Sequence, residues 1–269
     1  MMIAQSTSTS TVDRPGSLAR LGALVMPFVR LPLILAGLAA VYGFFRLTGH
    51  PQPWPAAVGM TNFVFPLTAD LGALLLLIHF TRQEGLHLRD LLGPFRREGL
   101  LREVLLGLGL FIGLALLFQV SALLGMLAVY GPGLFDPEQA AALGSDMAFV
   151  QPPLWVFWWS LLVLPVSVAF VEQMTYQGYA LPRLVRLLGG RTWAALLVVS
   201  LGFALQHTAL PLVDVQMSLA RFLGTLPVGL AFGLVYLRLG RLWPLIIAHW
   251  ALDFIGLGLL PLLAVLNAG

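Results

Sequence analysis

The chain has 269 residues, of which 59% are hydrophobic and only 10% are charged, and it contains no cysteine. Soluble globular domains usually carry about 25% charged residues, so this composition excludes an ordinary water-soluble domain. The mean hydropathy of +0.90 and the recurring long apolar runs predict an all-α protein, a polytopic bundle of transmembrane helices. Without cysteine or lysine there is no disulfide, thiolate metal site, cysteine nucleophile or Schiff base, so any chemistry must use carboxylates, histidines and hydroxyls.

The predicted elements begin after a polar tail. Residues 1–17 are rich in Ser and Thr and are predicted to be disordered, because they offer nothing to bury. Seven spanning helices are predicted after the tail, over residues 24–47, 58–80, 103–130, 153–180, 192–212, 218–238 and 242–265. The last run contains Gly256, Gly258 and Pro261, so a break there would give eight segments.

The net charge of +3 does not indicate a nucleic-acid partner, because the arginines lie in short loops and form no continuous basic face. With the N-terminus in the cytoplasm, twelve arginines fall in cytoplasmic segments. Arg46 and Arg221 fall near outer ends, and the loop 131–152 has no basic residue. The positive-inside rule therefore predicts an integral membrane protein with a cytoplasmic N-terminus, and we expect it in a bacterial inner membrane.

A few ionisable residues lie inside the predicted spans, where such groups are costly and usually functional. Those that stand out are Asp70, Glu172, His207, His249 and Asp253. His249 and Asp253 are four positions apart, so they share one helix face, where they could bind a metal or orient the imidazole. Asp70 is more readily explained as a buried partner of Arg30 or Asn62 than as a catalyst.

Three motifs in three of the predicted spans resemble the CPBP intramembrane proteases, the CAAX-processing and bacteriocin-processing group. That family carries Glu-Glu-x-x-x-Arg, Phe-x-x-x-His and His-x-x-x-Asn/Asp. The second and third motifs are complete here, as Phe203-Ala-Leu-Gln-His207 and His249-Trp-Ala-Leu-Asp253. The first reads Glu172-Gln173-Met-Thr-Tyr-Gln177, so its first glutamate is kept and two glutamines replace the other two residues.

The resemblance divides the chain into the tail (1–17), a variable N-terminal transmembrane region (18–152) and a protease-like four-helix core (153–269). Since Gln173 and Gln177 are four positions apart, we expect a structural pair that bonds amide to amide. Tyr176 and Phe203 are interpreted as packing residues beside the site.

The resemblance implies an intramembrane endopeptidase that hydrolyses a peptide bond of a membrane-associated peptide or lipidated protein. By that analogy Glu172 is the general base, His207 assists it, and His249 and Asp253 orient and stabilise the oxyanion. A zinc ion held by Glu172, His207 and His249 is the competing version, although the HExxH sequence of zinc proteases is absent.

Two other function classes remain open at this stage. The two replacements in the first motif would fit a catalytically impaired membrane scaffold or immunity-type protein. The same polar cluster could instead serve a small transporter, which would need a water-filled path to both faces. A single pocket around Glu172 and the histidines would favour the protease.

Overall fold

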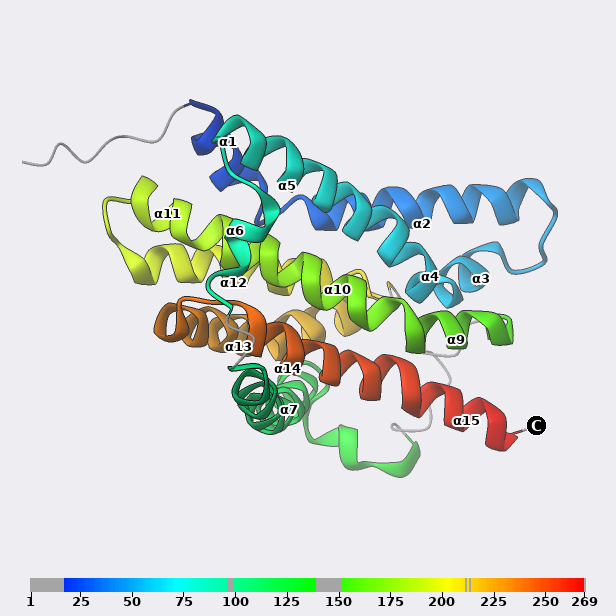
Figure 1. Ribbon diagram of the computed structural model, residues 1–269. Helices are drawn as coiled ribbons and strands as arrows, with labels where there is room; N and C mark the ends of the chain where they lie inside the picture. Colours follow the sequence, from blue (N-terminus) through cyan, green and yellow to red (C-terminus); the bar gives the residue numbers. More distant parts are fainter. Residues whose placement is uncertain (1–16, 96–98, 139–150, 211, 213, 269) are drawn as a thin grey trace, which may run out of the picture.

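The computed structural model describes residues 17–95, 99–138, 151–210, 212 and 214–268, and these parts are helical or form short connections (Figure 1). The predicted disordered tail lies outside the described residues except for Ser17, which begins the first helix. In chain order the elements are α1 (Ser17–Val25), α2 (Arg30–Leu47), α3 (Pro53–Gly59), α4 (Thr61–Phe65), η1 (Pro66–Asp70), α5 (Leu71–Gln83), α6 (Leu88–Leu92), α7 (Leu100–Tyr130), η3 (Gly131–Phe135), α9 (Leu154–Leu162), α10 (Leu164–Gln173), η4 (Met174–Ala180), α11 (Leu181–Leu187), α12 (Thr192–His207), α13 (Val215–Leu239), α14 (Trp243–Asp253), η5 (Phe254–Leu259) and α15 (Leu260–Ala268).

The all-helical prediction is confirmed, but the count of seven or eight spans is not. Five helices in the described chain are long and apolar enough to cross a membrane, and a sixth arises if α9 and the helix after it form one bent span. The predicted span that is missing from this count is the one that contains α12. Its 16 residues reach about 24 Å, which is shorter than a hydrocarbon core of about 30 Å. The last run counts as one span over Trp243–Asn267.

Proline produces the sharpest bend in a predicted span. The chain turns by 43° between α9 and α10, and Pro165 lies in the first turn of α10. Proline has no amide hydrogen to continue the helix ladder, so the long apolar run 153–180 becomes two helices. The bend directs α10 into the middle of the bundle.

The helix that carries the first motif lies at the centre of the molecule. Every residue from Val171 to Leu181 is buried, across the end of α10, all of η4 and the start of α11. Figure 1 shows α10 between α2 and α5 on one side and α14 and α15 on the other. Glu172 therefore reaches the interior without facing lipid.

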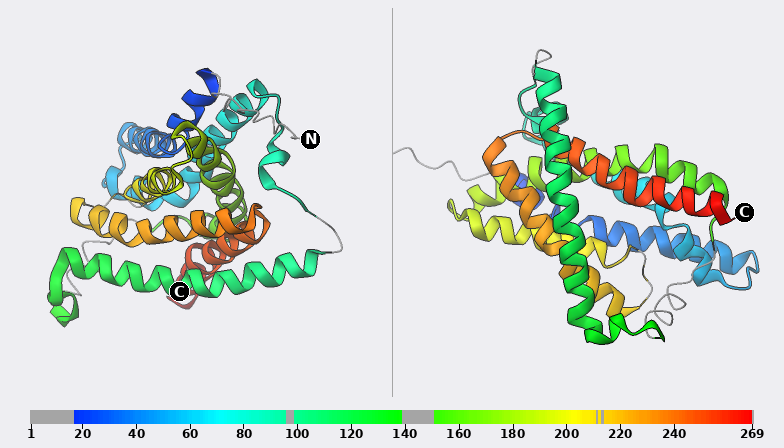
Figure 2. Two further views of the ribbon diagram at one scale, coloured as in Figure 1. Left: turned by 90° about the vertical axis from the view of Figure 1, so that its left-hand side faces the viewer. Right: turned by 90° about the horizontal axis from the view of Figure 1, so that it is seen from below.

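α7 is the longest of the described helices and crosses the rest of the bundle steeply (Figure 2). It packs on α13 where Gly125 meets Ala220 and Gly224. A side chain at Gly125 would collide with the carbonyl oxygen of Ala220, so a small residue is required for the two backbones to approach. This crossing makes α7 one wall of the cavity described below.

Candidate active site

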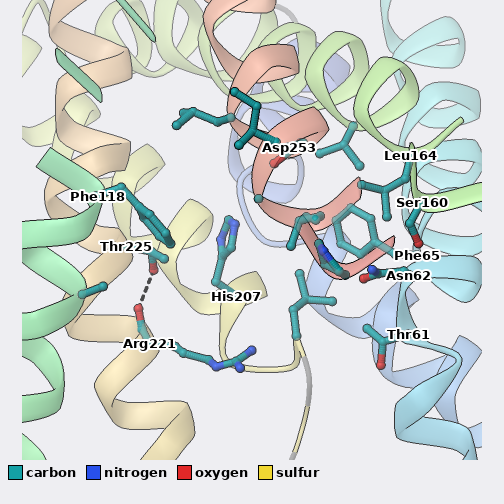
Figure 3. A pocket seen from close by; sticks show the side chains of 18 of the residues that line it. Thr61, Asn62, Phe65, Phe118, Ser160, Leu164, His207, Arg221, Thr225 and Asp253 are labelled. Carbon is teal, nitrogen blue, oxygen red and sulfur yellow. Dashed lines mark hydrogen bonds between the residues drawn. The ribbon is translucent and has the colours of Figure 1, made fainter. Parts of the chain in front are cut away.

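The four predicted catalytic residues line one cavity of about 730 Å³. Glu172 comes from α10, His207 from the end of α12, and His249 and Asp253 from α14. Most of the other lining residues are apolar, including Phe118, Leu164 and Val228. Figure 3 shows the side chains of His207 and Asp253 in this cavity. A largely apolar pocket with a few converging polar groups is the usual form of a small-molecule or peptide site.

His249 lies between two carboxylates. Its Nε2 atom is 3.8 Å from Oε2 of Glu172 and 3.5 Å from Oδ2 of Asp253. The predicted common face of His249 and Asp253 is therefore confirmed. On the other side of the ring, Nδ1 is 3.1 Å from Nε2 of Gln173. An amide nitrogen only donates, so Nδ1 accepts and the neutral ring carries its hydrogen on Nε2, toward the two carboxylates.

The prediction of a hydrogen bond between the side-chain amides of Gln173 and Gln177 is wrong. Gln173 instead directs its amide nitrogen at His249, and neither amide atom of Gln177 has a hydrogen-bond partner in the described chain. The prediction failed because η4, a π-helix, begins at Met174 between the two residues. Its wider turn changes which side chains share a face.

His207 presents its other nitrogen to the cavity. Nδ1 is 2.7 Å from the carbonyl oxygen of Phe203 and donates to it, so the lone pair of the neutral ring is on Nε2. The ring packs on that of Phe203, with centroids 4.6 Å apart. Phe203 also contacts Tyr176 and Phe232, which agrees with its predicted packing role.

A buried arginine, absent from the predicted site, contacts Glu172 directly. Arg30 on α2 is 0% exposed, and its Nη2 donates to Oδ1 of Asp70 at 2.6 Å and to Oε1 of Glu172 at 3.1 Å. Its Nε donates to Oε1 of Gln206 at 2.6 Å. The predicted pairing of Asp70 with Arg30 is confirmed, whereas the contacts to Glu172 and Gln206 were missed. An arginine inside an apolar span was the available signal.

The two oxygens of Glu172 consequently have different surroundings. Oε1 is held by Arg30, while Oε2 is buried, has no hydrogen-bond partner in the described chain and lies on the His249 side. Asp253 likewise keeps Oδ2 without a partner among the described residues. Both residues line the cavity, so these two oxygens remain available as hydrogen-bond acceptors there.

Each of the three π-helical segments in the described part of the chain adjoins a charged or polar residue of this cluster. η1 ends at Asp70, η4 starts immediately after Gln173, and η5 starts immediately after Asp253. π-helical turns are rare and occur often at functional sites. The local irregularities of the fold therefore coincide with the buried polar cluster.

The predicted zinc ligands are not arranged as a metal site. Within the described residues, no three His, Asp or Glu side chains are grouped so that they could hold a metal ion. One ring nitrogen of each histidine is hydrogen-bonded, and Arg30 occupies Oε1 of Glu172. The residues as they stand do not fit a metal, so no step below passes through one, and zinc remains only a prediction.

The comparisons with known proteins place the motifs in one family. Residues 153–255 match the family described as Type II CAAX prenyl endopeptidase Rce1-like. The matched segment includes Glu172, His207, His249 and Asp253 but excludes Arg30 and Asp70. The comparisons with curated proteins and with solved structures gave no match. The chain thus carries, over residues 153–255, an Rce1-like domain of the CAAX prenyl endopeptidase (CPBP) family.

Proposed function

We propose that the protein is an intramembrane endopeptidase that hydrolyses a peptide bond of a membrane-associated peptide or lipidated protein. The observation that carries the proposal is the Oε2 atom of Glu172, which has no hydrogen-bond partner among the described residues and faces His249 in a cavity also lined by His207. The description of the matched family as CAAX prenyl endopeptidases supports the same reaction and makes a prenylated peptide the first substrate class to test.

In the proposed reaction, Glu172 acts as the general base. Its Oε2 accepts a proton from a water molecule, whose oxygen attacks the carbonyl carbon of the scissile bond. His207 offers Nε2 as a second acceptor for the same water. The C–N bond then breaks, and the proton held by Glu172 passes to the leaving amine. The Nε2–H of His249 stabilises the negative charge on the substrate oxygen during attack.

Arg30 and Asp253 have positioning roles in this proposal. Arg30 holds Oε1 of Glu172 and thereby keeps Oε2 on the cavity side. Asp70 and Gln206 accept from Arg30 and fix its position. Asp253, 3.5 Å from Nε2 of His249, orients that ring. Arg30 supplies a guanidinium to the motif glutamate although Gln177 stands where the family has arginine, which favours an active enzyme over an impaired one.

We also propose the membrane arrangement predicted from the sequence: seven spans, with the short helix α12 among them, and a cytoplasmic N-terminus in a bacterial inner membrane. α12 is apolar and packs against α13 inside the bundle. The arginine-rich ends of the helices support the orientation.

The test is cleavage of membrane peptides, prenylated and unprenylated, by the purified full-length protein in liposomes, with products identified by mass spectrometry. Loss of a general base typically costs about 10²–10⁴-fold in rate, so we expect that loss for Glu172→Gln and a smaller one for His207→Ala. Glu138→Gln is the matched control, because Glu138 is exposed and lies outside the cavity lining.

Two results would contradict the proposal. Equal cleavage by the wild type and Glu172→Gln would exclude Glu172 as the base. Absence of cleavage across the whole peptide panel, by a protein that remains folded, would favour the scaffold alternative.

A further inference from the structure

The cavity contains a positive charge that the proposed reaction does not use. Arg221 lies on α13 and lines the same cavity as Glu172 and His207. Figure 3 shows its side chain reaching into the cavity on the side of His207 away from Asp253. Its guanidinium makes no ion pair with a carboxylate anywhere in the described chain. Its backbone carbonyl accepts a hydrogen bond from Thr225, which leaves the guanidinium unaffected.

The two acidic residues of the cavity lie beside His249 and make no ion pair with Arg221 in the described chain. Glu172 and Asp253 flank His249, and Glu172 is also bound to Arg30. Along α13, the lining residues near Arg221 in the chain are small or apolar, namely Met217, Ala220 and Gly224, and Tyr130 is a polar side chain that interacts with the guanidinium. A charged side chain in such surroundings is costly unless it meets an opposite charge. Arginine is well suited to a carboxylate, because its planar fork can donate two parallel hydrogen bonds.

The helical rise along α13 gives the distance between Arg221 and the site of the proposed reaction. Phe232, eleven positions after Arg221, packs on the His249 ring with centroids 5.1 Å apart. Eleven helical positions rise about 16 Å, which an extended peptide covers in about five residues. A cavity of about 730 Å³ is within the usual range for ligand pockets, so a short apolar segment can fill the space between the two points.

We propose that Arg221 binds a carboxylate of the substrate peptide, so that the peptide is cut no more than about five residues from that carboxylate. This inference rests on the proposed endopeptidase function and specifies its substrate: an apolar peptide segment with one negative charge beyond the scissile bond. The carboxylate is either the C-terminus of the peptide or an Asp or Glu side chain, and the experiment separates these two sources.

The experiment uses the full-length protein in liposomes and three versions of one cleavable apolar peptide. The first has a free C-terminal carboxylate, the second a C-terminal amide, and the third an amide with one Glu side chain near the end. We expect the wild type to cleave at least one carboxylate peptide at least tenfold more efficiently than the amide, mainly through KM. Arg221→Gln should cleave all three alike. Arg46→Gln, which removes an exposed arginine outside the cavity lining, should keep the wild-type preference.

Binding measurements separate this inference from the proposed function. In the Glu172→Gln background, the affinity of each labelled peptide is measured with and without Arg221→Gln. A carboxylate preference that depends on Arg221, without cleavage by the wild type, would sustain the inference as a binding site and overturn the peptidase. Cleavage by the wild type together with equal affinity for all three peptides would support the peptidase and overturn the inference about Arg221. A carboxylate preference that survives Arg221→Gln, or no preference in any assay, overturns the inference.

Discussion

Arg30 is a single side chain that links three helices through their polar groups. It is fully buried and donates to Asp70, Glu172 and Gln206, which come from η1, α10 and α12. A buried charge is tolerated only when partners of this kind replace its hydration. Its removal would leave two buried carboxylates facing each other without a cation, so the cost should appear in stability as well as in activity.

Replacing Arg30 by Met tests this role. Because breaking a buried ion pair from one side usually costs about 3–5 kcal/mol, we expect Arg30→Met to lower the free energy of unfolding in detergent by that amount. Arg46→Met, on the same helix but exposed, should change it little. The double variant Arg30→Met/Asp70→Leu should recover part of the loss. Equal stability of the Arg30 and Arg46 variants would contradict the ionic role.

The sequence predicted contacts between site residues best where both residues lie on one helix. The facing of His249 and Asp253 follows from helical periodicity alone, and the pairing of Asp70 with Arg30 follows from the cost of two isolated charges in apolar spans. The bonds from Arg30 to Glu172 and from Gln173 to His249 join residues 142 and 76 positions apart. Such contacts depend on how helices cross, which periodicity within one helix does not specify.

At the level of the helices, an ion pair joins Glu84, the residue that follows α5, to Arg183 on α11. Arg183 donates from Nη2 to Oε2 of Glu84 at 2.6 Å, and Tyr179 donates to Oε1 at 2.7 Å. The guanidinium also lies 3.7 Å from the centroid of the Tyr179 ring. Partial burial by itself raises the pKa of Glu84, but the hydrogen bonds from Arg183 and Tyr179 outweigh it, so the pKa lies below its usual value.

A lowered pKa makes this junction sensitive to acid. Stability from Glu84 is fully present above the unfolded pKa of about 4.3 and is lost as the pH falls through the lower folded pKa. Glu84→Gln should therefore reduce stability by about 1–3 kcal/mol near neutral pH and flatten the decline in melting temperature below about pH 4.3. Thermal unfolding in detergent from pH 7 to pH 3 measures both. Glu138→Gln should keep the wild-type pH profile, and an identical profile for Glu84→Gln would contradict the assignment.

The packing of α7 on α13 depends on Gly125. A methyl group there would meet the Ala220 carbonyl oxygen and the Gly224 nitrogen, both of which are backbone atoms that cannot move aside. Overpacking of this kind typically costs about 1–3 kcal/mol, and we expect that loss in the free energy of unfolding for Gly125→Ala.

Gly109 on the same helix supplies the control for this substitution. No atom lies within 4 Å of the position its Cβ would take. Gly109→Ala should therefore be neutral or stabilise α7 by about 0.5–1 kcal/mol, because alanine favours the helix. Equal effects of the two substitutions would show that α7 does not pack closely at Gly125.

The helix boundaries show where apolar patterning is a weaker guide. The pattern predicts the presence and order of the spans, since apolar runs of this length have few alternatives. It does not resolve the bend at α9–α10, the early end of α12 or the three π-helical segments. These features arise from proline and from contacts between helices, which hydropathy does not record.

Across the whole molecule, the cavity and the arginine-rich loops lie toward opposite ends. Figure 1 shows α1, α6 and α11 at one end of the bundle and α3, α9 and α15 at the other. Arg20, Arg89 and Arg183 belong to the first group, while the cavity is lined by Val58, Val156 and Pro261 of the second. If arginines mark the cytoplasmic side, substrate and water reach the site from the other side or from the bilayer.

The cysteine-free chain makes this arrangement directly measurable. We expect a single cysteine at Asn62, which lines the cavity, to react with a membrane-impermeant maleimide added outside intact spheroplasts. A cysteine at Arg89, exposed on α6, should react only after the membrane is permeabilised. Labelling of the Asn62→Cys variant only from the cytoplasmic side would reverse the predicted orientation.

The position of Arg30 has a consequence for how the chain can be divided. The family-matched segment begins at residue 153, yet its Glu172, the base in the proposed reaction, is hydrogen-bonded by Arg30, which lies 142 positions before Glu172. If the proposed function holds, the matched segment does not contain the whole site, because Arg30 on α2 contributes to it. A chimera joining residues 153–269 to the leading helices of another protein should lose activity unless those helices place an arginine side chain where Arg30 lies.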